Sequence, residues 1–292
     1  LAAEDNRQLP NSYTASMRWR TSTESGTGVV GELNTRVQAI AQVGNTVFTG
    51  GDFKNVVSAS GETVDQAFLA GYDVNSAELV RSFTPEINGQ IKALESLPNG
   101  LLAVGGEFTE VNGQPANGFV ILNPVTGETD TSLGWDVVNR VSGAVPVVKT
   151  IQVQGDYVYI GGAFTHVKGA TGSNYAYSRN AARFLLADHS VDLSWRPVTN
   201  GTVNGISASE DGVALAGYFN KVNDVNTVKL AYLSPTSGTI SKPWVWKPSY
   251  PINTTNGGFQ FDVQHANSEI WAGGSEHLIA QYSLSDLSRM SS

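Results

Sequence analysis

The sequence predicts an all-β protein built from one repeated unit of about 55 residues. Single or paired glycines end a series of apolar runs. The last glycine of each run is Gly51, Gly106, Gly162, Gly217 or Gly274, at steps of 55, 56, 55 and 57 residues. The chain has 31 glycines in 292 residues and lacks the 3.6-residue periodicity of amphipathic helices. So regular a period indicates that one structural unit was copied in tandem.

Each unit is expected to contain four short antiparallel strands separated by Gly, Asn, Asp and Pro turns. The fourth strand ends on a large aromatic residue: Phe83, Trp135, Trp195 or Trp246, with Trp19 in the matching place near the N-terminus. Sheets repeated in this way predict a β-propeller of five four-stranded blades. The blades begin near residues 19, 83, 135, 195 and 246 within a single domain, 1–292. Because the last strand of the fifth blade is weak, segment 1–18 is expected to close the ring, although a piece of a larger ring would give the same pattern.

One stretch of the repeat, GGEFTEVNG at residues 105–113, has a close second copy at 161–169. DTSL at 130–133 and DLSW at 192–195 are a second shared element. Over about residues 30–290, these motifs resemble the bacterial delta-60 repeat family of secreted or surface-attached, propeller-like proteins. The resemblance implies the architecture and an extracellular location. It implies no particular function, since fold alone does not determine function.

Composition narrows the class of protein. A net charge of −8 argues against binding nucleic acid, because phosphate recognition needs clustered cations. No run of about 18 apolar residues predicts a membrane span. The absence of cysteine excludes disulfides and thiol chemistry. Few lysines, many Asn and Thr residues, and a start at Leu1 instead of Met favour a secreted bacterial protein whose leader has been removed.

The first strand of each unit is expected to line a central channel. Its second position is polar in four units and aromatic in the fifth: Gln38, Lys92, Lys149, Asn204 and Phe261. Lys92 and Lys149 form a candidate anion site. The alternative is that both lysines are solvated at the channel mouth.

A second candidate site lies in the loops. Strand polarity places the connections from strand two to three, and from one blade to the next, on the same face, and insertions gathered on one face often mark a binding surface. The predicted ligand-binding residues there are Tyr175, Tyr177, Arg179 and Tyr250, together with Glu276 and His277 in the irregular fifth repeat. Exposed tyrosines beside Arg and Asn suit a carbohydrate ligand. Tolerated surface loops would have the same appearance.

No catalytic, metal or cofactor site is predicted. The four histidines lack zinc-ligand spacing. Asp52 and Glu107 suggest a carboxylate pair for glycoside hydrolysis, but they share a repeat position where a turn-capping role is the simpler interpretation. The sequence therefore predicts a non-enzymatic binding protein for a glycan or a surface protein. The alternatives are a polysaccharide-acting hydrolase or lyase, and a structural module of a larger surface protein.

Overall fold

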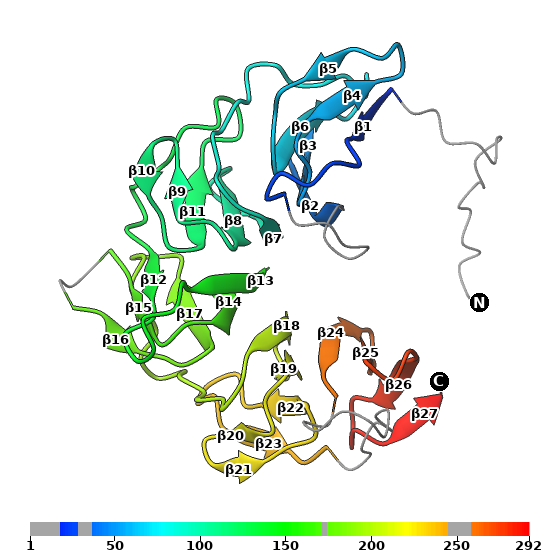
Figure 1. Ribbon diagram of the computed structural model, residues 1–292. Helices are drawn as coiled ribbons and strands as arrows, with labels where there is room; N and C mark the ends of the chain where they lie inside the picture. Colours follow the sequence, from blue (N-terminus) through cyan, green and yellow to red (C-terminus); the bar gives the residue numbers. More distant parts are fainter. Residues whose placement is uncertain (1–17, 29–36, 171–173, 245–257, 292) are drawn as a thin grey trace.

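The computed structural model describes residues 18–28, 37–170, 174–244 and 258–291, and every regular element in these ranges is a β-strand (Figure 1). This confirms the predicted all-β class. Five main antiparallel sheets follow one another along the chain, one for each predicted repeat, and four smaller sheets lie in the connections.

The sheets are built as follows. The first contains β2 (Val37–Val43), β3 (Thr46–Gly51) and β6 (Leu69–Asp73), and the second contains β7 (Ile91–Ser96), β8 (Leu102–Gly106) and β11 (Phe119–Leu122). The third contains β13 (Val147–Gln154), β14 (Tyr157–Ala163) and β17 (Ala181–Leu185). The fourth contains β18 (Val203–Ala208), β19 (Val213–Gly217), β22 (Leu230–Leu233) and β23 (Ile240–Lys242). The fifth contains β24 (Gln260–Ala266), β25 (Glu269–Gly274), β26 (Ile279–Ser283) and β27 (Arg289–Ser291).

The first strands of the five sheets lie in a row around a common centre. Strand β2 contacts β7, β13 contacts both β7 and β18, and β18 contacts β24. Figure 1 shows the sheets radiating outward from this centre, with an open side between β2 and β24. The space enclosed by the first strands is therefore bordered by all five repeats.

The predicted fourth strand is regular only in the last two sheets. In the first three it is reduced to one isolated bridge, at Leu79, Thr129 or Val191. In the second and third units an aspartate follows the bridge directly, and its carboxylate accepts hydrogen bonds from the serine two residues later. Such an Asp turn competes with strand pairing. In the fifth sheet, β27 fills the fourth position that segment 1–18 was expected to supply.

Segment 1–17 lies outside the described residues. Directly after it, β1 (Trp19–Thr21) pairs with β4 (Val56–Ser58) of the first unit. Strand β1 thus occupies the place that β12 (Asp136–Val138) holds beside β15 (His166–Lys168) in the third unit, and Trp19 and Trp135 match as the sequence predicts. Trp246 is outside the described residues, and Trp244 packs on Tyr282 in the fourth-to-fifth contact.

In the first four units, the connections from strand two to strand three contain small hairpins. They contain β4 with β5 (Thr63–Val64), β9 (Glu110–Val111) with β10 (Gln114–Pro115), β15 with β16 (Ala176–Tyr177), and β20 (Lys221–Val222) with β21 (Val225–Asn226). Each hairpin pairs with the segment that precedes its own first strand. The two classes of connection therefore lie together, as strand polarity requires.

The two repeated glycines have different physical roles. A Cβ on the second glycine would collide with a backbone carbonyl: it would lie 2.2 Å from the Gln90 oxygen at Gly106 and 1.9 Å from the Val147 oxygen at Gly162. A Cβ on the first glycine would collide with a side chain of the next sheet, as Gly50 shows with Ile91. The second glycine therefore allows the first two strands of a sheet to lie close together. The first glycine allows the next sheet to pack closely against its own.

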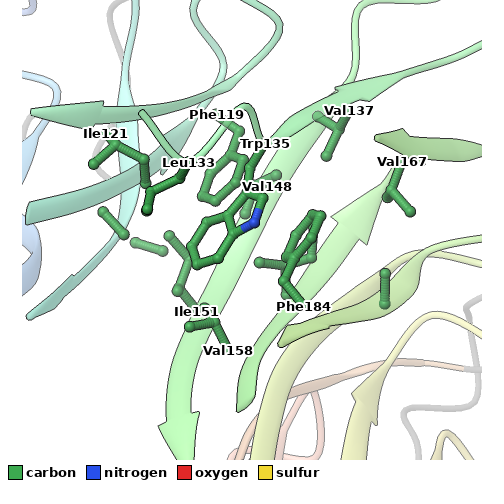
Figure 2. Packing of buried hydrophobic residues seen from close by; sticks show 14 of the residues in the cluster. Phe119, Ile121, Leu133, Trp135, Val137, Val148, Ile151, Val158, Val167 and Phe184 are labelled. Atoms are coloured by element: carbon green, nitrogen blue, oxygen red, sulfur yellow. The ribbon is translucent and has the colours of Figure 1, made fainter. Parts of the chain in front are cut away.

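The core lies between successive sheets. Between the second and third, Trp135 stacks on Phe184 with ring centroids 4.8 Å apart, and Phe119 stacks on the same pair (Figure 2). Burial of these rings and the surrounding aliphatic side chains is the main force that holds one repeat against the next. Trp135, the recurring aromatic residue of its unit, is thus a packing residue between two sheets.

Candidate functional site

A β-bulge recurs at the same point in all five sheets. The register between the first and second strands shifts at Val37/Ala39, Ile91/Ala93, Val148/Thr150, Val203/Gly205 and Gln260/Asp262. The skipped residues are Gln38, Lys92, Lys149, Asn204 and Phe261, the five positions expected to line the channel. A bulge leaves one residue unpaired and redirects its side chain, so the fold presents one variable side chain per repeat to the centre.

All five bulge residues line one central cavity of about 510 Å³. Thr150, Tyr218, Asp262 and Gln264 add polar groups, and aliphatic side chains of the first strands, including Ile40 and Leu94, form part of the wall. The volume falls in the range of small-ligand sites. The central cavity is therefore the primary candidate site.

The two lysines differ in how their charge is compensated. Lys92 Nζ lies 3.4 Å from a Glu107 carboxylate oxygen and donates to Gln90 Oε1 at 2.6 Å. Lys149 Nζ donates to Asn204 Oδ1 at 3.3 Å. Among the described residues, no carboxylate lies within ion-pair distance of Lys149. The repeat explains this, because Ala163 occupies in the third unit the position that Glu107 has in the second.

Burial lowers the pKa of Lys149. Repulsion from Lys92 lowers this pKa further, and attraction to Glu107 opposes both effects. A partly buried cation beside a second cation has an unfavourable energy that an incoming anion would relieve. The cavity therefore has the electrostatic character of an anion site, although the chain as a whole is acidic.

We expect Lys149→Gln to raise the free energy of unfolding at neutral pH. Because the folded-state pKa lies below the ordinary value of 10.5, the charge destabilises the fold below that lowered pKa. The cost declines as pH rises toward 10.5. Urea denaturation at several pH values should show the variant's advantage at pH 7 shrinking at high pH. The exposed Lys221→Gln is the control and should show no such trend.

Aromatic side chains form one wall of the cavity. The Tyr218 and Phe259 rings stack with centroids 4.6 Å apart, and Phe259 meets Phe261 edge-on at 4.7 Å. Lys149 Nζ lies 5.9 Å from the Tyr218 ring centroid. Tyr218 and Phe261 remain exposed. The cavity thus offers a flat apolar surface next to a cationic group.

Asp262 is the one carboxylate among the residues that line the cavity. Its pKa is raised by burial, with hydrogen bonds from the Val263 backbone and Gln264 opposing the shift. Glycoside hydrolysis of the usual kind needs two carboxyl groups flanking the bond. A lone carboxyl group with a raised pKa does not supply that arrangement.

Glu276 is connected to the central cavity by hydrogen bonds. Asn204 Nδ2 donates to the Gln260 carbonyl oxygen at 2.9 Å, and Gln260 Nε2 donates to both Glu276 carboxylate oxygens at 2.9 Å. A chain of hydrogen bonds therefore runs from Lys149 to Glu276. His277 follows in a left-handed conformation with φ of 61° and is exposed on the fifth sheet.

The tyrosines of the third unit form a separate cluster. The Tyr175 hydroxyl donates to Asp136, the Arg140 guanidinium lies 4.4 Å from the ring centroid, and Lys168 lies 6.0 Å from it. Burial and then the Asp136 hydrogen bond raise the pKa of Tyr175 to about 12. The ring is therefore already engaged within the protein and is not an open stacking surface.

Tyr177 is exposed on β16, with its ring edge-on to His166 at 5.3 Å, and Arg179 is half-buried nearby. Figure 1 places β12, β15 and β16 at the outer edge of the third unit, away from the first strands. The structure thus distributes the predicted residues over three places: the central cavity, the end of the fifth sheet and this outer cluster. Tyr250 lies outside the described residues.

The suggested Asp52–Glu107 pair has a structural explanation. Asp52 is buried and accepts hydrogen bonds from the Gly26 and Thr27 amides and from the Ser25 hydroxyl. Glu107 is the ion-pair partner of Lys92. Asp52 therefore caps the backbone amides of a turn, and Glu107 compensates the charge of Lys92.

Within the ranges that the structure describes, no group of three or more acidic or histidine side chains is arranged to hold a metal ion. In the same ranges, no helix has the length and apolarity needed to cross a bilayer.

Sequence reasoning missed Tyr218 and Asp262 as cavity residues. Tyr218 stands where other repeats have Asp52 or Glu107, so its departure from the repeat was a usable signal. Asp262 follows a bulge residue, and the bulge itself has no marker in a single sequence beyond the glycine that permits it.

No protein-family model matches the chain, and no curated protein matches it. Among solved structures, the extracellular domain of a one-component system from B. thetaiotaomicron is 13% identical with a TM-score of 0.47, covering 89% of this chain and 29% of that one. A nidogen/laminin complex gives 9% identity and a TM-score of 0.44, covering 88% of this chain and 79% of that one. The computationally designed Ika4 protein is 14% identical with a TM-score of 0.36, covering 70% of this chain and 94% of that one. Similarities of this size carry no argument about function.

Proposed function

We propose that this protein is a secreted or cell-surface, non-enzymatic binding protein whose five sheets are the blades of a propeller-like array and whose central cavity holds an acidic glycan. The observation that carries the proposal is the position of Lys149. It is a partly buried cation for which the described part of the chain offers no carboxylate partner, next to a second lysine and an exposed aromatic wall.

The ligand class follows from these two surfaces. The faces of sugar rings pack on aromatic side chains, and their hydroxyls bond to amides such as Asn204 and Gln264. A carboxylate or sulfate on the sugar would pair with Lys149 and Lys92. The extracellular location rests on the composition and on the resemblance described above.

Isothermal titration calorimetry with oligosaccharides that differ only in a carboxylate group tests the proposal. The acidic form should bind and the neutral form should bind at least ~10-fold more weakly, because a hydrogen bond to a charged group contributes about 1.5–3 kcal/mol. Lys149→Gln should remove most of the difference, and the exposed Lys221→Gln should leave it unchanged. Equal binding of both forms, or binding indifferent to Lys149, would refute the proposal.

The polysaccharide-acting enzyme remains the second candidate, since the raised pKa of Asp262 is a property of general acids. Asp262→Asn separates the two. In a binding protein, loss of this negative charge from the cavity strengthens anion binding. In an enzyme, it abolishes cleavage, which size analysis of an acidic polysaccharide before and after incubation would detect.

A further inference from the structure

Three pairs of neighbouring sheets share one packing device. In the second, third and fourth sheets, Ile91, Val148 and Val203 of the first strand each pair with the last glycine of their own sheet, and their side chains pack on the first glycine of the preceding sheet. A Cβ on Gly50 would lie 2.4 Å from Ile91, a Cβ on Gly105 2.8 Å from Val148, and a Cβ on Gly161 2.7 Å from Val203. A β-branched side chain on one sheet therefore fills a glycine hollow on the sheet before it.

The fifth sheet has the hollow without the side chain that should fill it. Gly273 is the equivalent glycine, and the atoms nearest to a Cβ there belong to Ile279 and Leu278 of its own sheet, at 3.4 Å. Around it, Phe261, Trp271, His277 and Ile279 line an open apolar depression of about 500 Å³. The corresponding face of the fourth sheet, at Ala214 and Leu230, is fully buried.

The first sheet has exposed apolar side chains at positions that are buried in the other sheets. Ile40 pairs with Thr49 as Leu94 pairs with Val104 and Ile206 with Leu215. The Ile40 side chain is 67% exposed, whereas Leu94 and Ile206 are at most 6% exposed. Val37, the repeat equivalent of Ile91, Val148 and Val203, is only half-buried. Among the described residues, no glycine hollow of a neighbouring sheet faces this β-branched side chain.

We infer that the fifth sheet of one molecule packs against the first sheet of a second copy, with Val37 of the second copy over Gly273. The glycine on one face and the β-branched residue on the other match a contact that occurs three times within the chain, so the interface continues an established packing mode. Within one molecule the described strands of the first and fifth sheets lie on either side of the open side (Figure 1). The contact is head-to-tail, and such a contact forms a closed pair or a longer assembly according to its rotation.

This inference rests on sheet packing. Ile279 tests it independently of any ligand in the central cavity, because Ile279 does not line that cavity, whereas Ile40 does. Sedimentation equilibrium of the full chain at micromolar concentration should show a dimer or larger species. Ile279→Asp and Ile40→Asp should each raise the dissociation constant at least ~10-fold, because a carboxylate would be buried unpaired in an apolar contact. Val125→Asp, at a residue with similar exposure (64%, against 65% for Ile279), is the control. A monomer at every concentration would overturn the inference.

Thiol pairing identifies the surfaces directly, because the chain has no cysteine of its own. A mixture of folded Val37→Cys and Gly273→Cys proteins should form a mixed disulfide on mild oxidation. Each variant alone should form far less of a homodimer. Absence of the mixed disulfide would overturn the inference. A protein with both substitutions that forms its disulfide only within one chain would also overturn the inference, because the first and fifth sheets of the same molecule would then meet.

Discussion

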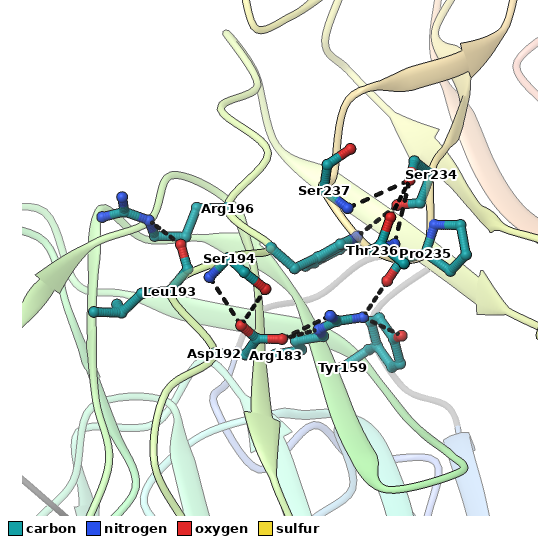
Figure 3. Close-up of polar contacts among 11 residues, drawn as sticks. Tyr159, Arg183, Asp192, Leu193, Ser194, Arg196, Ser234, Pro235, Thr236 and Ser237 are labelled. Carbon is teal, nitrogen blue, oxygen red and sulfur yellow. Dashed lines mark hydrogen bonds and ion pairs between the residues drawn. The ribbon is translucent and has the colours of Figure 1, made fainter.

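Replacing Arg183 with alanine is expected to lower the free energy of unfolding by about 3–5 kcal/mol, because it breaks a buried ion pair and leaves its partner uncompensated. The Arg183 side chain is 3% exposed, and its guanidinium lies 2.6 Å from Asp192. It also donates to the Tyr159 hydroxyl at 2.9 Å and to the Pro235 carbonyl at 2.5 Å, which ties the third sheet to the fourth (Figure 3). Urea denaturation followed by tryptophan fluorescence measures the loss.

Two variants sharpen this prediction. Arg183→Lys should recover little stability, since an ammonium cannot reproduce the planar fork or its stacking over Tyr157, 3.9 Å away. The exposed Arg196→Ala should cost less than ~1 kcal/mol. A small effect of Arg183→Ala would show that the third and fourth sheets are held together without this network.

Asp192 makes the network pH-dependent. Burial acts to raise its pKa, but hydrogen bonds from Ser194 and then Arg183 outweigh burial and hold the pKa below the ordinary value of 3.8. A lowered pKa in the folded state gives stability that is present above pH 3.8 and is lost as pH falls through the lowered pKa. This acid-sensitive contribution should be absent or smaller in Arg183→Ala.

Replacing Gly162 with alanine is the second large effect, with an expected loss of at least ~3 kcal/mol. The added Cβ would lie 1.9 Å from the Val147 carbonyl oxygen, a backbone atom held in the same sheet. The third sheet must therefore separate its first two strands or lose the bulge. Chemical denaturation measures the cost, and calorimetry should show a lowered Tm.

Gly273→Ala is the control, because it adds the same methyl group at a repeated glycine of the fifth sheet where there is room for it. The nearest atoms to its Cβ are side-chain and backbone atoms at 3.4 Å, an ordinary contact. We expect a stability change within ~1 kcal/mol. Similar losses at Gly162 and Gly273 would contradict the close-approach explanation of the repeated glycines.

The sequence predicted what depends on periodic residues. The strand order, the tandem units and the inward position of Gln38, Lys92, Lys149, Asn204 and Phe261 follow from apolar runs and turn residues that recur at a fixed spacing. The small hairpins were not predicted, since segments such as 166–177 carry only two or three pairing residues on each side. Their pairing depends on a segment from the preceding inter-unit connection, which local sequence does not reveal.

The candidate site was predicted in part for the same reason. Lys92 and Lys149 stood out as charged residues at a repeat position that faces inward. Whether each has a partner depends on the residue after the glycine pair, and comparing Glu107 with Ala163 would have shown the difference. Tyr175 looked like an exposed platform because its contacts with Asp136 and Arg140 join segments 35 or more residues apart.

The recurring bulge separates the residues that build the protein from those that give it chemical character. Because the bulge residue is skipped in the strand register, its side chain turns toward the cavity, and lysine, glutamine, asparagine and phenylalanine are accommodated on the same backbone. Five such positions meet at one cavity. The scaffold is therefore suited to recombination: exchanging only these five side chains should yield a family of proteins with the same fold and different ligand preferences.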